Sequence, residues 1–194
     1  MCDPGVPSQR QGRFIDTVMK IGGIDYSLCS PAVVVIDTET SEAHGHYLTD
    51  VNRNAKTYDL GWFKVTGQLH AHNTSPEQRY DQISDWAMAI IESCDKVVME
   101  DYALGAKGKV FHIGENAGLL KWKMWKAGKP FALIGPTALK KTATGKGNAD
   151  KIEMHRAFVE ATGLNLVEAI CPGSTKVANP VSDLVDAWWL AKQP

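Results

Sequence analysis

Ile21-Gly-Gly-Ile-Asp25-Tyr-Ser27 is closely followed by a second apolar run, Ala32-Val-Val-Val-Ile36. Both runs are rich in β-branched residues and are bounded by polar or turn-forming residues. We therefore predict two buried strands, over 20–25 and 31–37, joined by a tight turn. Asp25 ends the first strand. A carboxylate at this position contributes little to a core, but it is well placed to bind a ligand at the edge of a sheet.

Three more carboxylates have comparable settings. Glu100 ends the apolar run at 96–100, and Asp183 and Asp186 lie three residues apart in the apolar stretch 179–190. Residues at i and i+3 of a helix project from one face, although acids in a first helical turn are also favoured by the helix dipole alone. Mg²⁺ prefers oxygen ligands, and two such ions about 3.5–4 Å apart can assist an in-line displacement at phosphorus. The four acids together predict a metal-dependent nuclease site.

The remaining sequence alternates between strand and helix patterns. One or two further antiparallel strands are expected within 42–72, with a long loop at 50–59. Ser75 is the predicted N-cap of a helix that ends near Cys94, with Pro76 as its first residue and Gln78 completing a capping box. We also expect a strand at 131–134, a turn or short helix at 135–140, a loop at 142–148, helices over 110–127 and 149–161, and a last helix with Asn179 as N-cap and Pro180 first. This order predicts an α/β domain with a mixed sheet.

The length and composition indicate one ordinary globular domain. With 194 residues, 44% hydrophobic and 22% charged, we expect a flexible tail over 1–19 and a single domain over 20–194. No apolar run reaches the roughly 20 residues of a membrane span, and residues 1–19 lack the apolar core of a signal peptide. The four scattered cysteines contain no CxxC pair. These features predict a cytoplasmic protein without structural zinc or disulfides.

The net charge of −1 is unevenly distributed. Residues 102–151 contain ten lysines opposed only by Glu115 and Asp150, so this stretch carries +8 and the rest of the chain −9. Any one of these lysines could simply solvate a helix face. The asymmetry as a whole is typical of a protein that binds a polyanion with one face.

Four motifs in order resemble the RuvC-type Holliday-junction resolvases. They are the first-strand motif 21–27, the second acidic strand 97–100, a lysine-bearing loop and helix at 139–151, and the closing acidic helix 182–187. The order and spacing agree over residues 20–191. The resemblance implies a ribonuclease H-like fold with a mixed five-stranded sheet flanked by helices. It also implies a homodimer that nicks four-way DNA junctions symmetrically with Mg²⁺, in DNA recombination and repair, leaving 5′-phosphates.

The resemblance also implies roles for particular residues. The ligands of two Mg²⁺ ions, for which Mn²⁺ could substitute, would be Asp25, Glu100, Asp183 and Asp186. Lys151 would be catalytic, and Lys140 would be a second functional lysine, with Lys141 as the alternative if the register shifts by one. Where the family commonly has an aromatic residue three positions after the second acid, this chain has Ala103, so Tyr102 is the candidate to stack on bases. The predicted DNA-binding residues are Lys107, Lys109, Lys140, Lys141, Lys146 and Tyr102.

Other functions remain open on the sequence alone. The same fold could cut RNA–DNA hybrid or other branched DNA, since fold does not fix substrate. A non-catalytic DNA-binding module would not need the four acids. Sugar kinases and actin-like ATPases share the Gly-Ile-Asp-x-Ser opening but need two large lobes, for which 194 residues are too few. A phage or bacterial source would place the protein in the cytoplasm of the bacterium.

Histidine and tryptophan patterns also allow two interpretations. The pairs His44/His46 and His70/His72 could each bind metal from one strand face, but exposed strand histidines are the favoured interpretation. Trp122 and Trp125 alternate with lysines, so they could contact DNA or pack in a dimer interface, and packing is favoured.

Overall fold

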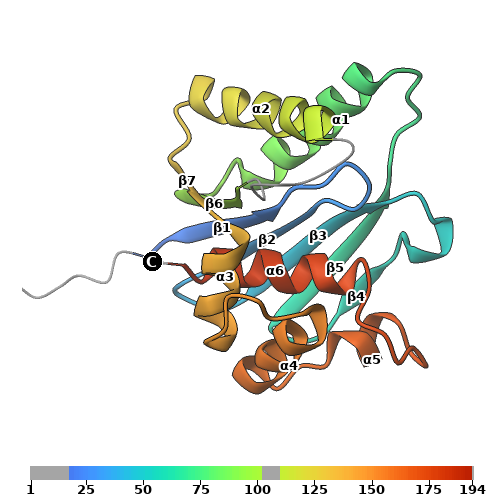
Figure 1. Cartoon of the computed structure of the whole chain (residues 1–194), viewed down its shortest axis with the longest axis vertical. Coiled ribbons are helices and arrows are strands. Elements are labelled where there is room, and N and C mark those ends of the chain that lie inside the picture. The colour runs from blue at the N-terminus through green and yellow to red at the C-terminus, as the bar shows by residue number, and fades with distance from the viewer. Residues whose placement is uncertain (1–17, 102–109, 194) are drawn as a thin grey trace, which may run out of the picture.

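The computed structural model describes residues 18–101 and 110–193, which form a mixed sheet with helices on both faces (Figure 1). Seven strands pair in the order β4-β5-β3-β2-β1-β6-β7. The strands are β1 (Lys20–Asp25), β2 (Ala32–Asp37), β3 (Ala43–Thr49), β4 (Thr57–Asp59), β5 (Phe63–Leu69), β6 (Lys96–Glu100) and β7 (Phe131–Ile134). The α/β class and the mixed sheet were predicted correctly, whereas the expectation of five strands was wrong.

The additional strands come from residues 42–72. β3 pairs antiparallel with β2, as expected, but β5 runs parallel to β3. Between them a short 3-10 helix, η1 (Asn52–Asn54), and β4 return the chain along the outer edge, where β4 pairs antiparallel with β5. This return makes the parallel pairing possible, because parallel neighbours need a crossover connection rather than a hairpin.

The helices divide between the two faces of the sheet (Figure 1). Helices α1 and α2 cover one face, and the core there includes Ile24, Val33, Ile83, Leu120 and Met124. Helices α3 to α6 lie on the other face. The helices are α1 (Pro76–Ile91), α2 (Val110–Lys126), α3 (Pro136–Thr144), α4 (Lys151–Thr162), α5 (Leu166–Ile170) and α6 (Val181–Ala191). No helix in 18–101 or 110–193 is long and apolar enough to cross a membrane.

Two glycines allow α6 to lie directly on the sheet. A Cβ atom at Gly23 would lie 2.0 Å from the carbonyl oxygen of Ala187 and 2.4 Å from the amide nitrogen of Ala191. A Cβ atom at Gly45 would lie 2.8 Å from the side chain of Leu184. At Gly23 only glycine permits this close approach of backbone to backbone, whereas at Gly45 the close contacts are with the side chains of Leu184 and Phe63. The absent side chains on β1 and β3 therefore determine where α6 sits.

The ends of the helices confirm the sequence predictions only in part. The Ser75 hydroxyl accepts a hydrogen bond from the Gln78 amide at 3.2 Å, as predicted, but the Gln78 side chain accepts from the Thr74 amide instead of completing the box. Helix α3 continues to Thr144, so the predicted loop at 142–148 is partly helical, and α5 was not predicted. The N-cap of α6 is Pro180, one residue later than expected. The Asn179 side chain is consequently not used as a cap.

Candidate active site

Two of the four acids end neighbouring strands. β1 and β6 are parallel, and Ile24 lies opposite Met99, so Asp25 and Glu100 finish their strands at the same edge of the sheet. Side chains two residues apart on a strand share a face. Because Gly23 faces α6 and Val98 belongs to the core on the α6 side, Asp25 and Glu100 lie on that face as well.

The other two acids come from α6. Ala187 lies over Gly23, so Asp183, one helical turn earlier, lies toward the end of β1 that carries Asp25. Asp183 is buried, with only 7% of its surface exposed, and Asp186 is half-buried on the same stretch of helix. The structure thus brings together four carboxylates that are up to 161 positions apart in the sequence.

The pKa values of the four acids show that their charges interact. Burial, followed by the charges of Asp183, Glu100 and Asp186, raises the pKa of Asp25 well above its usual value. Burial and the charge of Asp186 raise the pKa of Glu100 to about 7, and burial and the charge of Asp183 raise the pKa of Asp186 to about 6. Burial also raises the pKa of Asp183, against the opposing effect of the nearby Ser30 and Ser182 hydroxyls. Carboxylates that share a desolvated space behave in this way until a cation offsets their charge.

The donor chemistry fits a hard divalent cation. One oxygen of Asp183, Oδ1, lies 3.0 Å from the Ser182 hydroxyl, while Oδ2 is buried without a hydrogen-bond partner in the described residues. Mg²⁺ and Mn²⁺ both accept carboxylate oxygens. Within residues 18–101 and 110–193, however, no three His, Cys, Asp or Glu side chains are already spaced to hold a metal ion. Binding would therefore require the carboxylates to draw together.

Two lysines supply positive charge to the acids. Lys151 is the first residue of α4, and it lowers the pKa of Asp25, Asp183 and Asp186 against the effect of burial. Lys140 on α3 does the same for Glu100 and Asp186. Both lysines for which the sequence resemblance implies a role thus lie close enough to the four acids to lower the pKa values of some of them.

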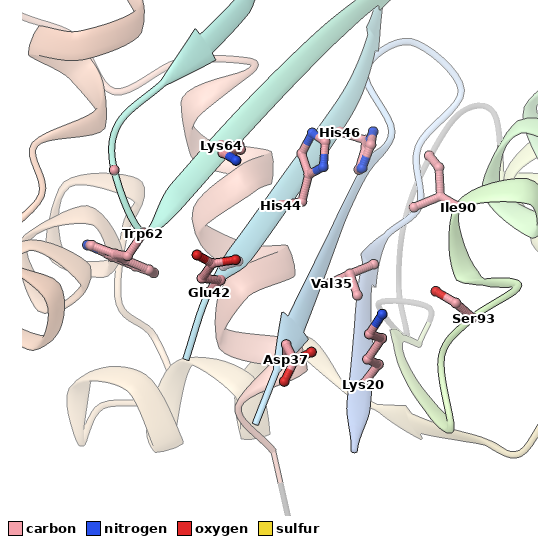
Figure 2. Close-up of a pocket in the computed structure, with 12 residues that line it drawn as sticks. Lys20, Val35, Asp37, Glu42, His44, His46, Trp62, Lys64, Ile90 and Ser93 are labelled. Carbon is pink, nitrogen blue, oxygen red and sulfur yellow. The ribbon is translucent and has the colours of Figure 1, made fainter. Parts of the chain in front are cut away.

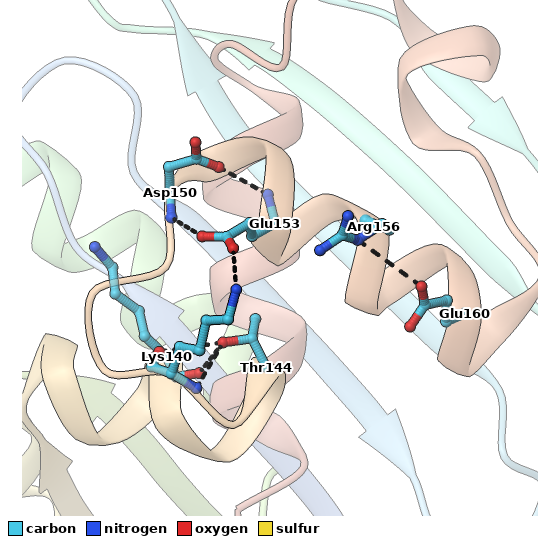
Figure 3. A network of polar contacts seen from close by, with 7 residues as sticks. Lys140, Thr144, Asp150, Glu153, Arg156 and Glu160 are labelled. Carbon is cyan, nitrogen blue, oxygen red and sulfur yellow. Dashed lines mark hydrogen bonds and ion pairs between the residues drawn. The ribbon is translucent and has the colours of Figure 1, made fainter.

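The other predicted DNA-binding residues are placed less favourably or lie outside the described residues. The Lys146 ammonium is 2.9 Å from the Glu153 carboxylate. Glu153 forms the capping box of α4 with Asp150 (Figure 3). The charge of Lys146 is therefore already paired. Lys141 is exposed on α3. Residues outside the described ranges are Tyr102, Lys107 and Lys109.

Sequence reasoning missed two polar residues beside the acids. Asn179 was interpreted as a helix cap, and Ser182 was not assigned a role. The Lys151 ammonium donates to Asn179 Oδ1 at 3.2 Å and to Ser182 Oγ at 3.1 Å. The available signal was the presence of a small hydroxyl residue directly before the first acid of the closing helix.

A separate cavity of about 340 Å³ opens on the sheet face that α1 partly covers (Figure 2). The four acids lie on the other face, which α6 covers. His44 and His46 line the cavity with ring centroids 4.0 Å apart, and both are half-buried instead of exposed as expected. Burial lowers the pKa of both, to about 4 for His46, and the nearby Lys64 lowers that of His44 further. A cation beside the pair and the lack of a third protein ligand in the described residues argue against a metal site here.

Comparison with family profiles and with curated protein sequences finds no match to the chain. Among solved structures, Thermus thermophilus RuvC is similar, with a TM-score of 0.56 and 19% identity over 89% of this chain and 91% of that one. T. thermophilus RuvC in complex with Holliday junction substrate is similar with a TM-score of 0.60 and 18% identity, over 89% of this chain and 90% of that one. The chain therefore has a RuvC-like fold.

Proposed function

We propose that this protein is a magnesium-dependent, structure-selective DNA endonuclease that resolves four-way junctions by paired symmetric nicks. The observation that carries the proposal is the meeting of four carboxylates from β1, β6 and α6 with two lysines at one edge of a RuvC-like sheet. The similar T. thermophilus RuvC structure in complex with a Holliday junction supports branched DNA as the substrate.

The four acids would hold two Mg²⁺ ions, with Mn²⁺ able to substitute. When bound, such ions would activate a water molecule and stabilise the leaving oxygen. Cleavage of the bond between phosphorus and the 3′-oxygen, with the proton of the water passing to solvent and the 3′-oxygen leaving as a hydroxyl, would leave a 5′-phosphate. Asp183 would bind through Oδ2, the oxygen that lacks a partner in the described residues. Lys151 would stabilise negative charge that develops on the scissile phosphate, and Lys140 would contribute from the Glu100 side of the site.

Cutting two strands symmetrically calls for two copies of the site. Helix α2 carries large apolar side chains on its surface: Phe111, Trp122 and Trp125 are 84%, 50% and 71% exposed. Their spacing of eleven and three residues places them along one side of the helix. We propose that this stripe forms the interface of a homodimer, whose two-fold axis would match that of a junction.

A panel of labelled substrates tests the proposed activity. The protein is incubated with a synthetic four-way junction, linear duplex of the same sequence, and RNA–DNA hybrid, each with Mg²⁺ or with chelator. We expect paired nicks near the crossover, in the junction only and with Mg²⁺ only. Cutting confined to the hybrid would contradict junction resolution and favour a ribonuclease H-like activity, and cutting of linear duplex at an equal rate would contradict structure selectivity.

A further inference from the structure

We propose that Asn179 and Ser182 are positioning residues, which together hold the Lys151 ammonium and the Asp183 carboxylate in place at the candidate active site. This inference rests on the proposed nuclease function and deepens it, because it names what fixes the catalytic groups. The two side chains lie between α4 and α6, and they connect the lysine of one helix with the acid of the other.

The contacts form a short chain. Lys151 Nζ donates to Asn179 Oδ1 at 3.2 Å and to Ser182 Oγ at 3.1 Å. The Ser182 hydroxyl lies 2.9 Å from Asn179 Oδ1 and 3.0 Å from Asp183 Oδ1. A hydroxyl has one proton, so it donates to one of these two oxygens while it accepts from the lysine. Lys151 has three N–H donors, and two of them are used here, which leaves the third for a phosphate oxygen.

Helix stability does not explain these residues. Lys151 occupies the first position of α4, where the positive end of the helix dipole disfavours a cation. Asn179 makes no cap for α6, because the N-cap is Pro180 and it forms no side-chain capping bond. Ser182 is buried, with 3% of its surface exposed, and its side-chain hydrogen-bond partners within the described residues all belong to this set of contacts. Each residue is better explained by the contacts between the two helices.

The hydrogen bonds have a consequence for each of the two groups that they connect, the Lys151 ammonium and the Asp183 carboxylate. At one end, two acceptors hold an otherwise flexible lysine in one rotamer, so less entropy is lost when a phosphate binds. At the other end, the Ser182 hydroxyl lies at Asp183 Oδ1, so Oδ2 is the oxygen left to bind a cation. Loss of Asn179 and Ser182 would release both groups without removing either.

The direct test is a ¹⁵N spectrum of the lysine ammonium groups in the full-length protein, without DNA or metal. Ammonium groups that are hydrogen-bonded exchange slowly with water and give signals, whereas freely solvated groups do not. Lys151 is identified by comparison with Lys151→Arg. Lys123, which binds Asp81 and Asp85 at 2.6 Å each, and Lys129, which binds main-chain carbonyl groups, are internal controls for folding.

Four variants are compared with the wild type: Asn179→Ala, the double variant Asn179→Ala/Ser182→Ala, Asn179→Asp, and Glu160→Gln. We expect the Lys151 signal to disappear in the double variant while the Lys123 and Lys129 signals persist. The single-turnover cleavage rate should fall about tenfold to a hundredfold, as is usual for misplaced reacting groups, with junction affinity in chelator changed less than about twofold. Asn179→Ala, which leaves only the Ser182 acceptor, should weaken the signal and lower the rate, whereas Asn179→Asp keeps an oxygen acceptor and should retain the signal and most of the rate. Glu160→Gln, exposed on α4, should change neither.

A Lys151 signal that persists in the double variant would overturn the inference, as would a normal cleavage rate after the signal is lost. The spectrum does not depend on nuclease activity. If the wild type cuts no junction and the signal still behaves as expected, the proposed function fails while the positioning of Lys151 stands.

Discussion

The burial and mutual repulsion of the acids predict that replacing Glu100 by Gln stabilises the metal-free protein. The pKa of Glu100 is raised from 4.5 to about 7, chiefly by burial and by Asp186. Each pKa unit corresponds to about 1.4 kcal/mol, so ionised Glu100 destabilises the fold by about 3 kcal/mol. Glutamine keeps the shape but not the charge. For a domain of this size the gain corresponds to a rise in Tm of about 6–12 °C.

Thermal unfolding in chelator at about pH 8 measures this gain, with Glu160→Gln as a matched control on the exposed face of α4. The same comparison at about pH 5 should show little difference, because Glu100 is then protonated and already neutral. A Tm for Glu100→Gln at or below that of the wild type at pH 8 would refute the reasoning. It would mean that the carboxylates do not share a desolvated space.

Three further predictions follow from the same structure. Because the pKa values of Glu100 and Asp186 are raised to about 7 and about 6, the metal-free folded state binds protons more tightly than the unfolded chain. Measured by urea titration in chelator relative to the variant Glu100→Gln/Asp186→Asn, so that the contribution of the buried histidines cancels, the free energy of unfolding of the wild type should therefore rise by about 4 kcal/mol between about pH 8 and pH 5. The absence of a rise over that range would contradict the shifts. Gly23→Ala places a methyl group 2.0 Å from the Ala187 carbonyl oxygen, so urea titration should show a loss of about 3 kcal/mol, and an unchanged midpoint would show that α6 does not lie on β1 as described. Trp125→Glu puts a charge into the exposed stripe of α2 and should convert a dimer to monomer in sedimentation experiments, whereas an unchanged dimer would place the interface elsewhere.

The four acids were predictable because each occupies a position that a core does not explain. Asp25 and Glu100 end apolar strands, and this local pattern can be recognised in the sequence without knowledge of the fold. Their convergence with Asp183 and Asp186 was inferred from these positions and from the i, i+3 spacing of the helical pair, and the order of the motifs supported it. The structure shows why the acids meet, because Gly23 and Gly45 leave room for α6 to pack directly on the sheet. The sequence alone does not reveal which helix will approach a given glycine.

The sequence predictions were wrong where a local sequence pattern is compatible with more than one structure. The region 42–72 shows strand alternation, but alternation does not reveal which strand will be the partner, so the parallel pairing of β3 with β5 was missed. Asn179 before a proline is a good helix cap by propensity, yet its side chain is used by Lys151 from another helix. Polar residues that contact distant segments carry no periodic signal, which is why Asn179 and Ser182 emerged only from the structure.

We propose that four carboxylates form one metal-dependent cleavage site for branched DNA. The measurement that tests it most directly is single-turnover cleavage of a four-way junction, labelled on opposed strands, by wild type and Asp183→Asn with Mg²⁺. The wild type should cut both strands at symmetric positions. The variant should cut neither strand while binding the junction with nearly wild-type affinity, because a ligand oxygen and a charge are lost but the fold is kept. Normal cutting by Asp183→Asn would contradict the assignment of the site.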